Sequence, residues 1–376
     1  MKTYISDANC ITPLGFSVQE NWEALRDNRS GVMSQEFSEQ FPEICASVIQ
    51  SKKLDEVFSQ NFQDENFTRL EKMLLLSLDT LVKKNKISDK TLLILSTTKG
   101  NISLLKNQQH PPKGIYLTEL AQKIADFYQF KTTPIVVCNA CVSGVLSLAV
   151  AKNLLQGDTY SDAYIIAGDE VSDFVVSGFN SFQAMSAGPC KPYDKNRIGI
   201  NLGEAAAAVY LSKNLPENGF CFEIMGNGSV NDANHISGPS RDGEGLYQSI
   251  LSAMKEANIS AEQIDFVSAH GTATVYNDEM ESFAFSRAGL SEVPLNSLKG
   301  YYGHCLGAAG LLETIIAMES AKEGLLIKSL GYEENGVSQP ITVIEENTSK
   351  NIAFILKTAS GFGGCNAAVI LKKIQK

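Results

Sequence analysis

The chain has 376 residues, which is long enough to bury a large core as two domains or as one two-lobed domain. Its net charge of −10 argues against nucleic acid as a partner, because phosphate binding needs a basic face. No apolar run reaches the roughly 20 residues that a membrane-spanning helix needs, and no basic-then-apolar leader opens the chain. We therefore expect a cytoplasmic protein without a membrane partner, whose eight scattered cysteines are free thiols.

Short apolar runs alternate with longer helical stretches along the chain, a pattern that predicts α/β layers. In the first half we expect strands at residues 92–96, 134–138, 164–168 and 205–211, and a helix buried on most sides at 142–151. In the second half we expect strands at 264–269, 352–357 and 367–371, and a helix at 307–321. The repeated pattern predicts two pseudo-duplicated halves, 1–215 and 216–376.

Cys141 stands where the strand at 134–138 gives way to the helix at 142–151. A helix amino end carries partial positive charge and unpaired N–H groups, and both stabilise a thiolate. We therefore predict that Cys141 has a lowered pKa and acts as a nucleophile. The plain alternative is a buried apolar cysteine.

Two further readings of Cys141 remain open. With Cys138 it forms a Cys-x-x-Cys pair, which suits a redox-active dithiol, although Cys138 falls in the expected strand. With His270 and His304 it offers ligands for zinc, although the close spacings of structural zinc sites are absent.

Two of the four histidines lie in frames of small residues. His270 ends the strand at 264–269, and His304 follows Gly303 just before the helix at 307–321. Lys299 precedes His304 by five residues in an uncharged segment, where a lysine is ordinarily a solvated surface residue. A functional role for Lys299 requires a carboxylate nearby, and Glu281 is the candidate.

Hydroxyl and glycine residues complete the candidate site. Thr272 and Thr274 can hydrogen-bond an amide-bearing ligand arm. The segment 361–366 is a glycine turn between two late strands, without the spacing of a phosphate-binding loop. Its backbone N–H groups could line a cavity with Phe362 as an apolar gate, or the turn could be a plain hairpin.

Taken together, these motifs resemble those of the β-ketoacyl-[acyl carrier protein] synthases, the elongating condensing enzymes of the thiolase-fold superfamily. Four motifs occur in the family's order: Cys138 to Gly144, His270 to Glu281, Lys299 to Gly310 and Gly361 to Asn366. Weaker similarity covers the opening residues 11–32 and the middle segment 189–204. The resemblance implies a layered α-β-α-β-α thiolase-like fold.

The resemblance also implies a mechanism, a decarboxylative Claisen condensation of an acyl thioester with malonyl-acyl carrier protein. Cys141 accepts the acyl group, and His270 and His304 assist decarboxylation and stabilise the enolate, which gives a 3-oxoacyl product. The resemblance implies that Lys299, held by Glu281, sets the electrostatics of the histidine site. It implies that the backbone N–H groups of Cys141 and Phe362 form the oxyanion hole. It also implies a set of substrate-binding residues, which are Thr272, Thr274, Phe362, Gly363 and Asn366. No metal or resident cofactor is implied, because phosphopantetheine arrives on the carrier protein.

Several departures from the family pattern bear on the pathway. They are Ser360 where a phenylalanine is frequent, Asp169 where a glycine is common, Ala205 in place of a glycine, and a short segment from 100 to 133. They motivate the hypothesis of a specialised fatty-acid or polyketide synthase that builds polyene or aryl polyene chains.

The expected partner is an acyl carrier protein, which is acidic, so a basic docking patch is predicted at Arg69, Lys72 and Lys191. By resemblance we expect a homodimer, or a heterodimer with a chain-length-factor-like subunit. A non-catalytic partner subunit and a redox-active dithiol protein are the competing function classes.

Overall fold

The computed structural model describes residues 2–63, 66–106, 110–217, 219–232 and 238–375. The first half of the chain contains β1 (Tyr4–Ile11), α1 (Val18–Arg26), β2 (Met33–Glu36), β3 (Glu43–Ser47), α2 (Ser51–Asn61), α3 (Arg69–Lys84), β4 (Thr91–Ser96), η1 (Ile102–Leu105), η2 (Lys113–Ile115), α4 (Leu117–Phe127), β5 (Ile135–Val137), α5 (Ser143–Leu155), β6 (Asp162–Asp169), α6 (Asp173–Ser181), β7 (Leu202–Gly203) and β8 (Ala205–Ser212).

The second half contains β9 (Phe220–Asn231), α7 (Glu244–Ala257), η3 (Ala261–Gln263), β10 (Phe266–Ser268), α8 (Val275–Arg287), β11 (Pro294–Asn296), α9 (Lys299–Tyr302), η4 (Leu306–Ala308), α10 (Ala309–Glu323), β12 (Leu325–Leu326), β13 (Thr342–Val343), β14 (Thr348–Ser349), β15 (Phe354–Gly361) and β16 (Cys365–Gln375). No helix in the part of the chain that the structure describes is long and apolar enough to cross a bilayer.

An 11-stranded sheet runs through the molecule in the order β13-β11-β10-β15-β16-β9-β1-β8-β6-β4-β5. The two halves of this order repeat each other. The first half contributes five strands to the sheet, and they lie in the order third, second, fourth, fifth and first (β5-β4-β6-β8-β1). When the edge strand β13 is left out, the second half contributes five strands in the same order (β11-β10-β15-β16-β9). The pairing senses also match, because β8 and β16 are antiparallel to both neighbours while the other pairs within each set are parallel. The predicted pseudo-duplication is therefore confirmed.

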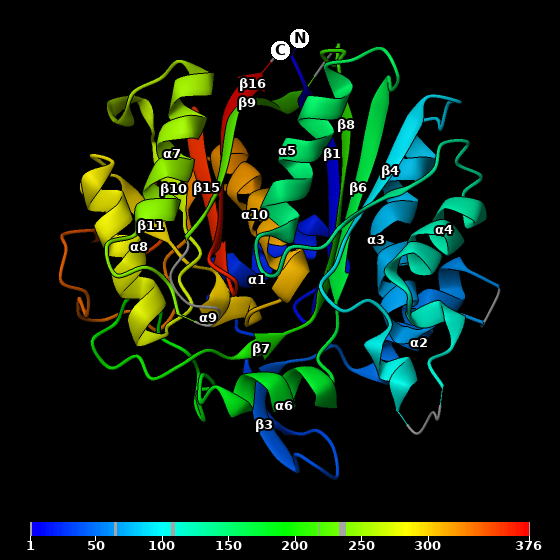
Figure 1. Ribbon diagram of the computed structural model, residues 1–376, viewed down its shortest axis with the longest axis horizontal. Helices are drawn as coiled ribbons and strands as arrows, with labels where there is room; N and C mark the ends of the chain where they lie inside the picture. Colours follow the sequence, from blue (N-terminus) through cyan, green and yellow to red (C-terminus); the bar gives the residue numbers. More distant parts are fainter. Residues whose placement is uncertain (1, 64–65, 107–109, 218, 233–237, 376) are drawn as a thin grey trace.

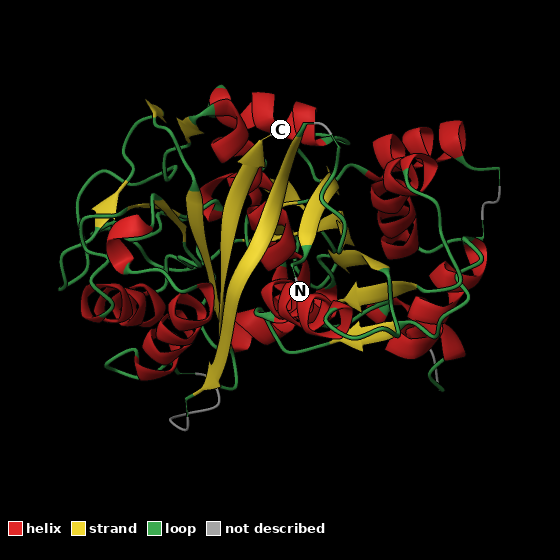
Figure 2. Ribbon diagram, turned by 90° about the horizontal axis from the view of Figure 1, so that it is seen from above, coloured by secondary structure: helices red, strands yellow, loops and turns green. Residues whose placement is uncertain are grey.

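The halves join where β1 pairs with β9 antiparallel, and the sheet bends there, so that its two arms face each other across a central helical layer (Figure 1). Helices α5 and α10 fill that layer, α7 and α8 cover the outside of one arm, and α3 and α4 cover the outside of the other. The view from above shows helices on both sides of the strands (Figure 2). The predicted α-β-α-β-α layering is confirmed.

Sequence explains why these elements take these layers. Every residue of β4 and β6 is buried, as expected of strands that are covered on both faces, and the residues between their polar ends are mostly apolar. Helix α10 is buried along nearly its whole length, and its sequence is apolar on all sides apart from a few polar residues. Helix α3 begins with a capping box between Thr68 and Glu71 and presents one apolar face to the sheet.

Candidate active site

Cys141 sits in a tight turn between β5 and α5. Ala140 adopts a positive φ of 44°, which turns the backbone sharply just before the thiol. Gly144, in the first turn of α5, allows close packing with α10, because a Cβ there would lie 2.5 Å from the backbone nitrogen of Leu311. The nucleophile is thus fixed by the contact between the two central helices.

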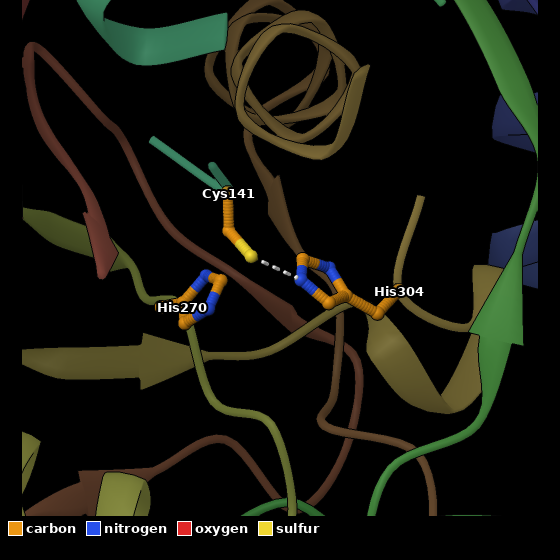
Figure 3. Close-up of side chains that lie close together, drawn as sticks. All are labelled: Cys141, His270 and His304. Atoms are coloured by element: carbon orange, nitrogen blue, oxygen red, sulfur yellow. Dashed lines mark hydrogen bonds between the residues drawn. The ribbon is translucent and has the colours of Figure 1, made fainter. Parts of the chain in front are cut away.

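The three predicted catalytic side chains converge (Figure 3). The Nε2 atom of His304 lies 2.9 Å from the Sγ atom of Cys141, and the rings of His270 and His304 are 5.2 Å apart, nearly perpendicular. One ligand atom from each of the three residues lies within 4.8 Å of the other two. The arrangement can exchange a proton between sulfur and imidazole and can contact one bound carbonyl group from two sides.

The predicted lowering of the Cys141 pKa is wrong for this site. Burial raises the pKa of Cys141 to about 12, and the charge of Lys299 offsets this only in part. The thiol is 8% exposed, so a thiolate would lose its hydration, which outweighs the favourable end of α5. Cys141 is therefore a thiol beside a neutral imidazole, and His304 is placed to take its proton as the bond to substrate forms.

Carboxylates on α8 hold the loop that carries His270. Glu281 accepts hydrogen bonds from the backbone N–H groups of His270 (2.9 Å) and Gly271 (2.7 Å), and Asp278 accepts one from Thr272 (2.9 Å). Burial, together with the charge of Asp278, raises the pKa of Glu281 to about 7. Glu281 therefore positions the backbone of the histidine loop.

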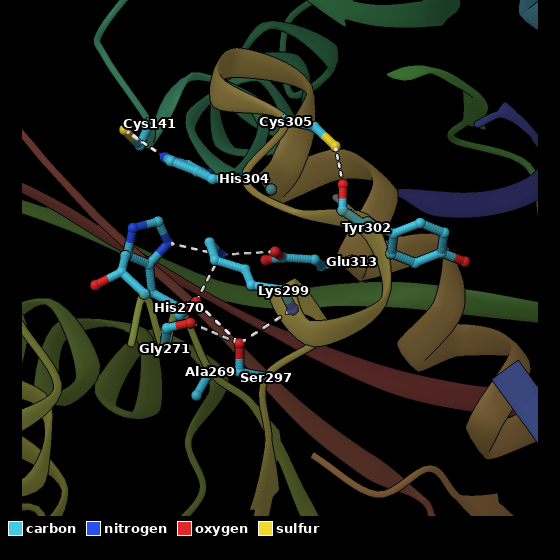
Figure 4. Close-up of polar contacts among 12 residues, drawn as sticks. Cys141, Ala269, His270, Gly271, Ser297, Lys299, Tyr302, His304, Cys305 and Glu313 are labelled. Carbon is cyan, nitrogen blue, oxygen red and sulfur yellow. Dashed lines mark hydrogen bonds and ion pairs between the residues drawn. The ribbon is translucent and has the colours of Figure 1, made fainter. Parts of the chain in front are cut away.

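Lys299 does not pair with Glu281 as predicted. Its ammonium group is fully buried and pairs with Glu313 of α10 at 2.8 Å, and it donates to the carbonyl oxygen of His270 (Figure 4). The ammonium also lies 3.4 Å from Nδ1 of His270. Because an ammonium can only donate, Nδ1 accepts, which leaves the N–H of His270 on Nε2. The helix α10 brings in the carboxylate, an arrangement that the spacing of residues around Lys299 does not show.

Both imidazoles are held neutral. Burial and the charges of Lys299 and Lys357 lower the pKa of His304 well below its ordinary value, and burial, Lys299, His304 and Lys357 do the same for His270. The ligand atoms of Cys141, His270 and His304 are close enough for a metal ion, but two buried ammonium groups beside them disfavour a divalent cation. The donor set therefore fits acid–base chemistry better than metal binding.

A cavity of about 430 Å³ opens over these groups. Its lining includes Cys141, His270, His304, Thr272 and Thr274, as the sequence predicted. The hydroxyls of the two threonines lie 2.8 Å apart at its wall. Such a cavity, with a few polar groups among apolar ones, has the character of a ligand site.

The glycine turn between β15 and β16 borders the same cavity through Phe362. The Phe362 ring stacks on Phe179 with centroids 5.6 Å apart and meets Phe182 edge-on at 5.2 Å, which supports the predicted gate. A Cβ on Gly361 would lie 3.0 Å from the backbone nitrogen of Cys141, so the turn and the nucleophile's N–H are neighbours. This proximity is what an oxyanion hole shared by Cys141 and Phe362 requires.

Other predicted substrate contacts differ. Gly363 has a φ of +87° and is not part of the cavity lining, so it serves the shape of the turn. Asn366 lines the cavity, but its side chain is engaged by Asp232 (3.1 Å) and by the hydroxyl of Ser360 (2.8 Å). Ser360 is itself in the lining, and it makes this wall more polar than a phenylalanine would.

The predicted docking residues are unequally available. The guanidinium of Arg69 pairs with the fully buried Glu204 and donates to the carbonyl oxygen of Ile49, so its place in a docking patch stays a prediction. Lys72 pairs with Asp55 at 2.6 Å and lies over the ring of Phe58. Lys191 is more exposed and lies 3.9 Å from Glu333.

Sequence reasoning missed two buried charges, Glu313 and Lys357. Glu313 interrupts an apolar helix and Lys357 an apolar strand, and both are almost completely buried. A charged residue inside an apolar run was the available signal, because such residues are rarely buried unless paired.

Comparison with known proteins identifies the family of the chain. The model described as "Beta-ketoacyl synthase, N-terminal domain" matches residues 5–216, and "Beta-ketoacyl synthase, C-terminal domain" matches residues 221–333. The chain belongs to the β-ketoacyl synthase family. The predicted family and the class of enzyme, an acyltransferase of the 3-oxoacyl-[acyl-carrier-protein] synthase type, are thereby confirmed.

Individual relatives of this β-ketoacyl synthase are 3-oxoacyl-[acyl-carrier-protein] synthases of bacteria and of a yeast, Schizosaccharomyces pombe. It is 25% identical to 3-oxoacyl-[acyl-carrier-protein] synthase 2 of Vibrio harveyi over 100% of this chain and 99% of the relative. It is 32% identical to 3-oxoacyl-[acyl-carrier-protein] synthase 2 of Rhizobium meliloti over 63% of this chain and 60% of the relative. A ketosynthase solved in complex with its chain length factor, from Xenorhabdus doucetiae, has the same fold, with a TM-score of 0.86, 21% identity and coverage of 99% and 98% of the two chains.

Proposed function

We propose that this synthase condenses a Cys141-bound acyl group with malonyl-acyl carrier protein, with His270 and His304 as the other catalytic residues. The observation that carries the proposal is the contact of His304 Nε2 with Cys141 Sγ at 2.9 Å, with the ring of His270 beside it under the same cavity. A non-catalytic subunit would have no need of this contact. A redox dithiol is disfavoured because Cys138 is exposed while Cys141 is buried and faces the cavity.

In the first half-reaction, Cys141 takes the acyl group. His304 accepts the proton of the thiol while sulfur attacks the thioester carbonyl, and the proton then goes to the departing carrier thiol. The backbone N–H groups of Cys141 and Phe362 hold the oxyanion that forms. The Cys141 thiol and the His304 imidazole are both neutral before the substrate binds. Charge therefore develops on them only as the sulfur attacks the thioester.

In the second half-reaction, malonyl-carrier protein loses carbon dioxide and the resulting enolate attacks the acyl thioester. The fixed Nε2–H of His270 supports this step, since it can donate to the developing enolate oxygen. Bond formation between the enolate carbon and the acyl carbon breaks the bond to the Cys141 sulfur. The released sulfur takes up a proton from solvent, because its first proton left on the carrier thiol. Thr272 and Thr274 hold the amide-bearing pantetheine arm at the wall of the cavity.

A direct assay decides the reaction. The purified protein is incubated with acyl-carrier protein and malonyl-carrier protein, and carbon dioxide and the 3-oxoacyl product are measured. Equal amounts of the two products support the proposal. Carbon dioxide release without a 3-oxoacyl product, or neither product with any acyl group tested, overturns it.

For the substrate, we propose an unsaturated or aromatic acyl chain of a specialised pathway, as in polyene or aryl polyene synthesis. Support comes from the polar wall at Ser360 and from the stacked rings of Phe179 and Phe362 at the gate. In competition, the enzyme should extend unsaturated or aromatic acyl carriers in preference to saturated medium-chain ones. Preference for the saturated chain would remove this part of the proposal.

We propose that the chain divides into its two halves near residue 215. For assembly, we propose a dimer, formed with a second copy of the chain or with a chain-length-factor-like subunit. Strand β5 ends the large sheet and is incompletely buried, so it can pair with another chain. The ketosynthase from Xenorhabdus doucetiae, named as a complex with its chain length factor, supports the heterodimeric form. Light scattering of the purified chain, alone and co-expressed with candidate subunits, distinguishes the two forms from a monomer.

A further inference from the structure

Lys357 is a buried charge that the proposed mechanism does not use. It lies on β15, paired in parallel register with Ser268 of β10, two residues before His270. Its side chain is 0% exposed. Lys357 shares the central-layer face of β15 with Ile355 and Ala359, both members of the central hydrophobic core, so this lysine stands where apolar side chains are the rule.

Three acceptors surround the Lys357 ammonium. It donates to the carbonyl oxygens of Ser268 (3.1 Å) and Ala269 (3.2 Å) and to Oε2 of Glu313 (2.6 Å). The other carboxylate oxygen, Oε1, pairs with Lys299. All three ammonium hydrogens therefore have partners, which is the condition for burying a charge.

Two ammonium groups thus share one carboxylate. Burial alone would favour a protonated Glu313, but Lys299 and Lys357 hold its pKa below the ordinary value. The cluster carries a surplus positive charge, and the charges of Lys299 and Lys357 act on both His270 and His304, while Glu281 on α8 is a further acid that acts on Lys357. A positive charge opposes protonation of a neighbouring imidazole.

We propose that Lys357 is a second cationic positioning residue of the histidine site, which clamps the strand end that carries His270 and adds positive charge beside both imidazole rings. The inference rests on the proposed function for its consequence, since a protonated His304 could not accept the proton of Cys141. Lys357 would extend the working range of the enzyme to lower pH, and it acts through the histidines without touching substrate.

Histidine titration tests this without any activity assay. Wild type, Lys357→Met and Lys357→Gln are labelled with ¹³C-histidine, and ring signals are followed against pH by NMR. Signals of His270 and His304 are assigned from their loss in His270→Gln and His304→Gln, and the exposed His110 serves as an internal control. Without the Lys357 charge, the titration midpoints of His270 and His304 should both rise by about one pH unit.

The two variants separate charge from structure. Gln can still donate to the carbonyl of Ser268, whereas Met cannot, so a purely structural role predicts wild-type titration in Lys357→Gln. The charge role predicts the same upward shift in both variants and an acid limb of malonyl decarboxylation that moves to higher pH with it. Unchanged midpoints in a folded Lys357→Gln protein overturn the inference. A wild-type protein that never condenses would refute the proposed function, yet the titration would still decide the role of Lys357.

Discussion

The two halves of the molecule place different chemistry at the same positions of one scaffold. After its third strand, β5, the first half carries Cys141 and then the central helix α5. After its third strand, β11, the second half carries His304 and then the central helix α10. Because the helices pack against each other, the two equivalent turns meet as thiol and imidazole. The duplicated fold thus brings the two turns together, and the individual residues Cys141 and His304 determine the chemistry there.

The loops after the second strands differ more. In the first half, Thr97 and Thr98 after β4 donate to the buried carboxylate of Asp169, which also accepts from the N–H of Gly307 at 2.7 Å. In the second half, the His270 loop is pinned by acids and also flanked by the lysines that pair with Glu313. The first half holds the buried thiol of Cys141 in a fixed place, whereas the second half sets the protonation state of the His270 and His304 rings.

The largest effect is expected at the nucleophile of the first half. Cys141→Ala should reduce condensation by about three orders of magnitude or more, because no other group can carry the acyl chain. Cys138→Ala is the matched control and should stay near wild type, since Cys138 is exposed and does not line the cavity. Product formation measured for both variants checks this, and loss of activity in Cys138→Ala alone would support the dithiol alternative.

The charge cluster of the second half should dominate stability. Glu313→Gln leaves two buried ammonium groups without their carboxylate and should lower the free energy of unfolding by about 3–5 kcal/mol. Glu319→Gln, on the same helix, breaks a pair with the partly exposed Lys322 and should cost about 1 kcal/mol or less. Urea unfolding measures both. Equal losses of unfolding free energy in the two variants would mean that the buried charge cluster stabilises the protein no more than the partly exposed pair.

Asp169 is the corresponding test in the first half. Asp169→Asn turns an amide N–H₂ group toward the donors of Thr98 and Gly307 and should cost about 1–3 kcal/mol of unfolding free energy. Acylation of Cys141 should also slow, because Gly307 lies three residues after His304 and its anchoring holds that segment in place. Thermal unfolding at wild-type values would show that Asp169 does not anchor the two segments.

The pH dependence of alkylation tests how the thiol is held. Since burial raises the pKa of Cys141 to about 12, the thiolate fraction should grow about tenfold for each pH unit between 7 and 9. Iodoacetamide rates, followed on the peptide that contains Cys141 in the Cys138→Ala background, provide the measurement. A plateau at pH 7 would instead indicate a thiolate stabilised by the end of α5.

The smallest effect is expected at the surface. Lys191→Glu should raise the apparent KM for carrier protein by a few fold, in line with about 1 kcal/mol or less for an exposed charge pair. The KM for a small thioester substrate should not change. An unchanged KM for the carrier protein removes Lys191 from the docking surface.

The strands and helices around Cys141, His270 and His304 could be predicted, because local patterns of apolar and small residues determine the secondary structure of these segments. The partner of Lys299 could not be predicted, because Glu281 and Glu313 are both near it in sequence. Only the placement of α10 against β15 selects Glu313. The pKa of Cys141 depends on how deeply the two halves together bury its thiol. No local sequence pattern predicts this burial. Lys357 interrupts an apolar run, but only the placement of β15 in the layers shows that its side chain is buried.

Intact-mass measurement after incubation with acyl-carrier protein tests the central claim most directly, that Cys141 and His304 form one acyl-transfer unit across the two halves. The account predicts one acyl group per chain, located on the Cys141 peptide, which disappears when malonyl-carrier protein is added. In Cys141→Ala no adduct should form, and in His304→Ala it should form slowly. An adduct on Cys138, or one that malonyl-carrier protein leaves in place, would contradict the account.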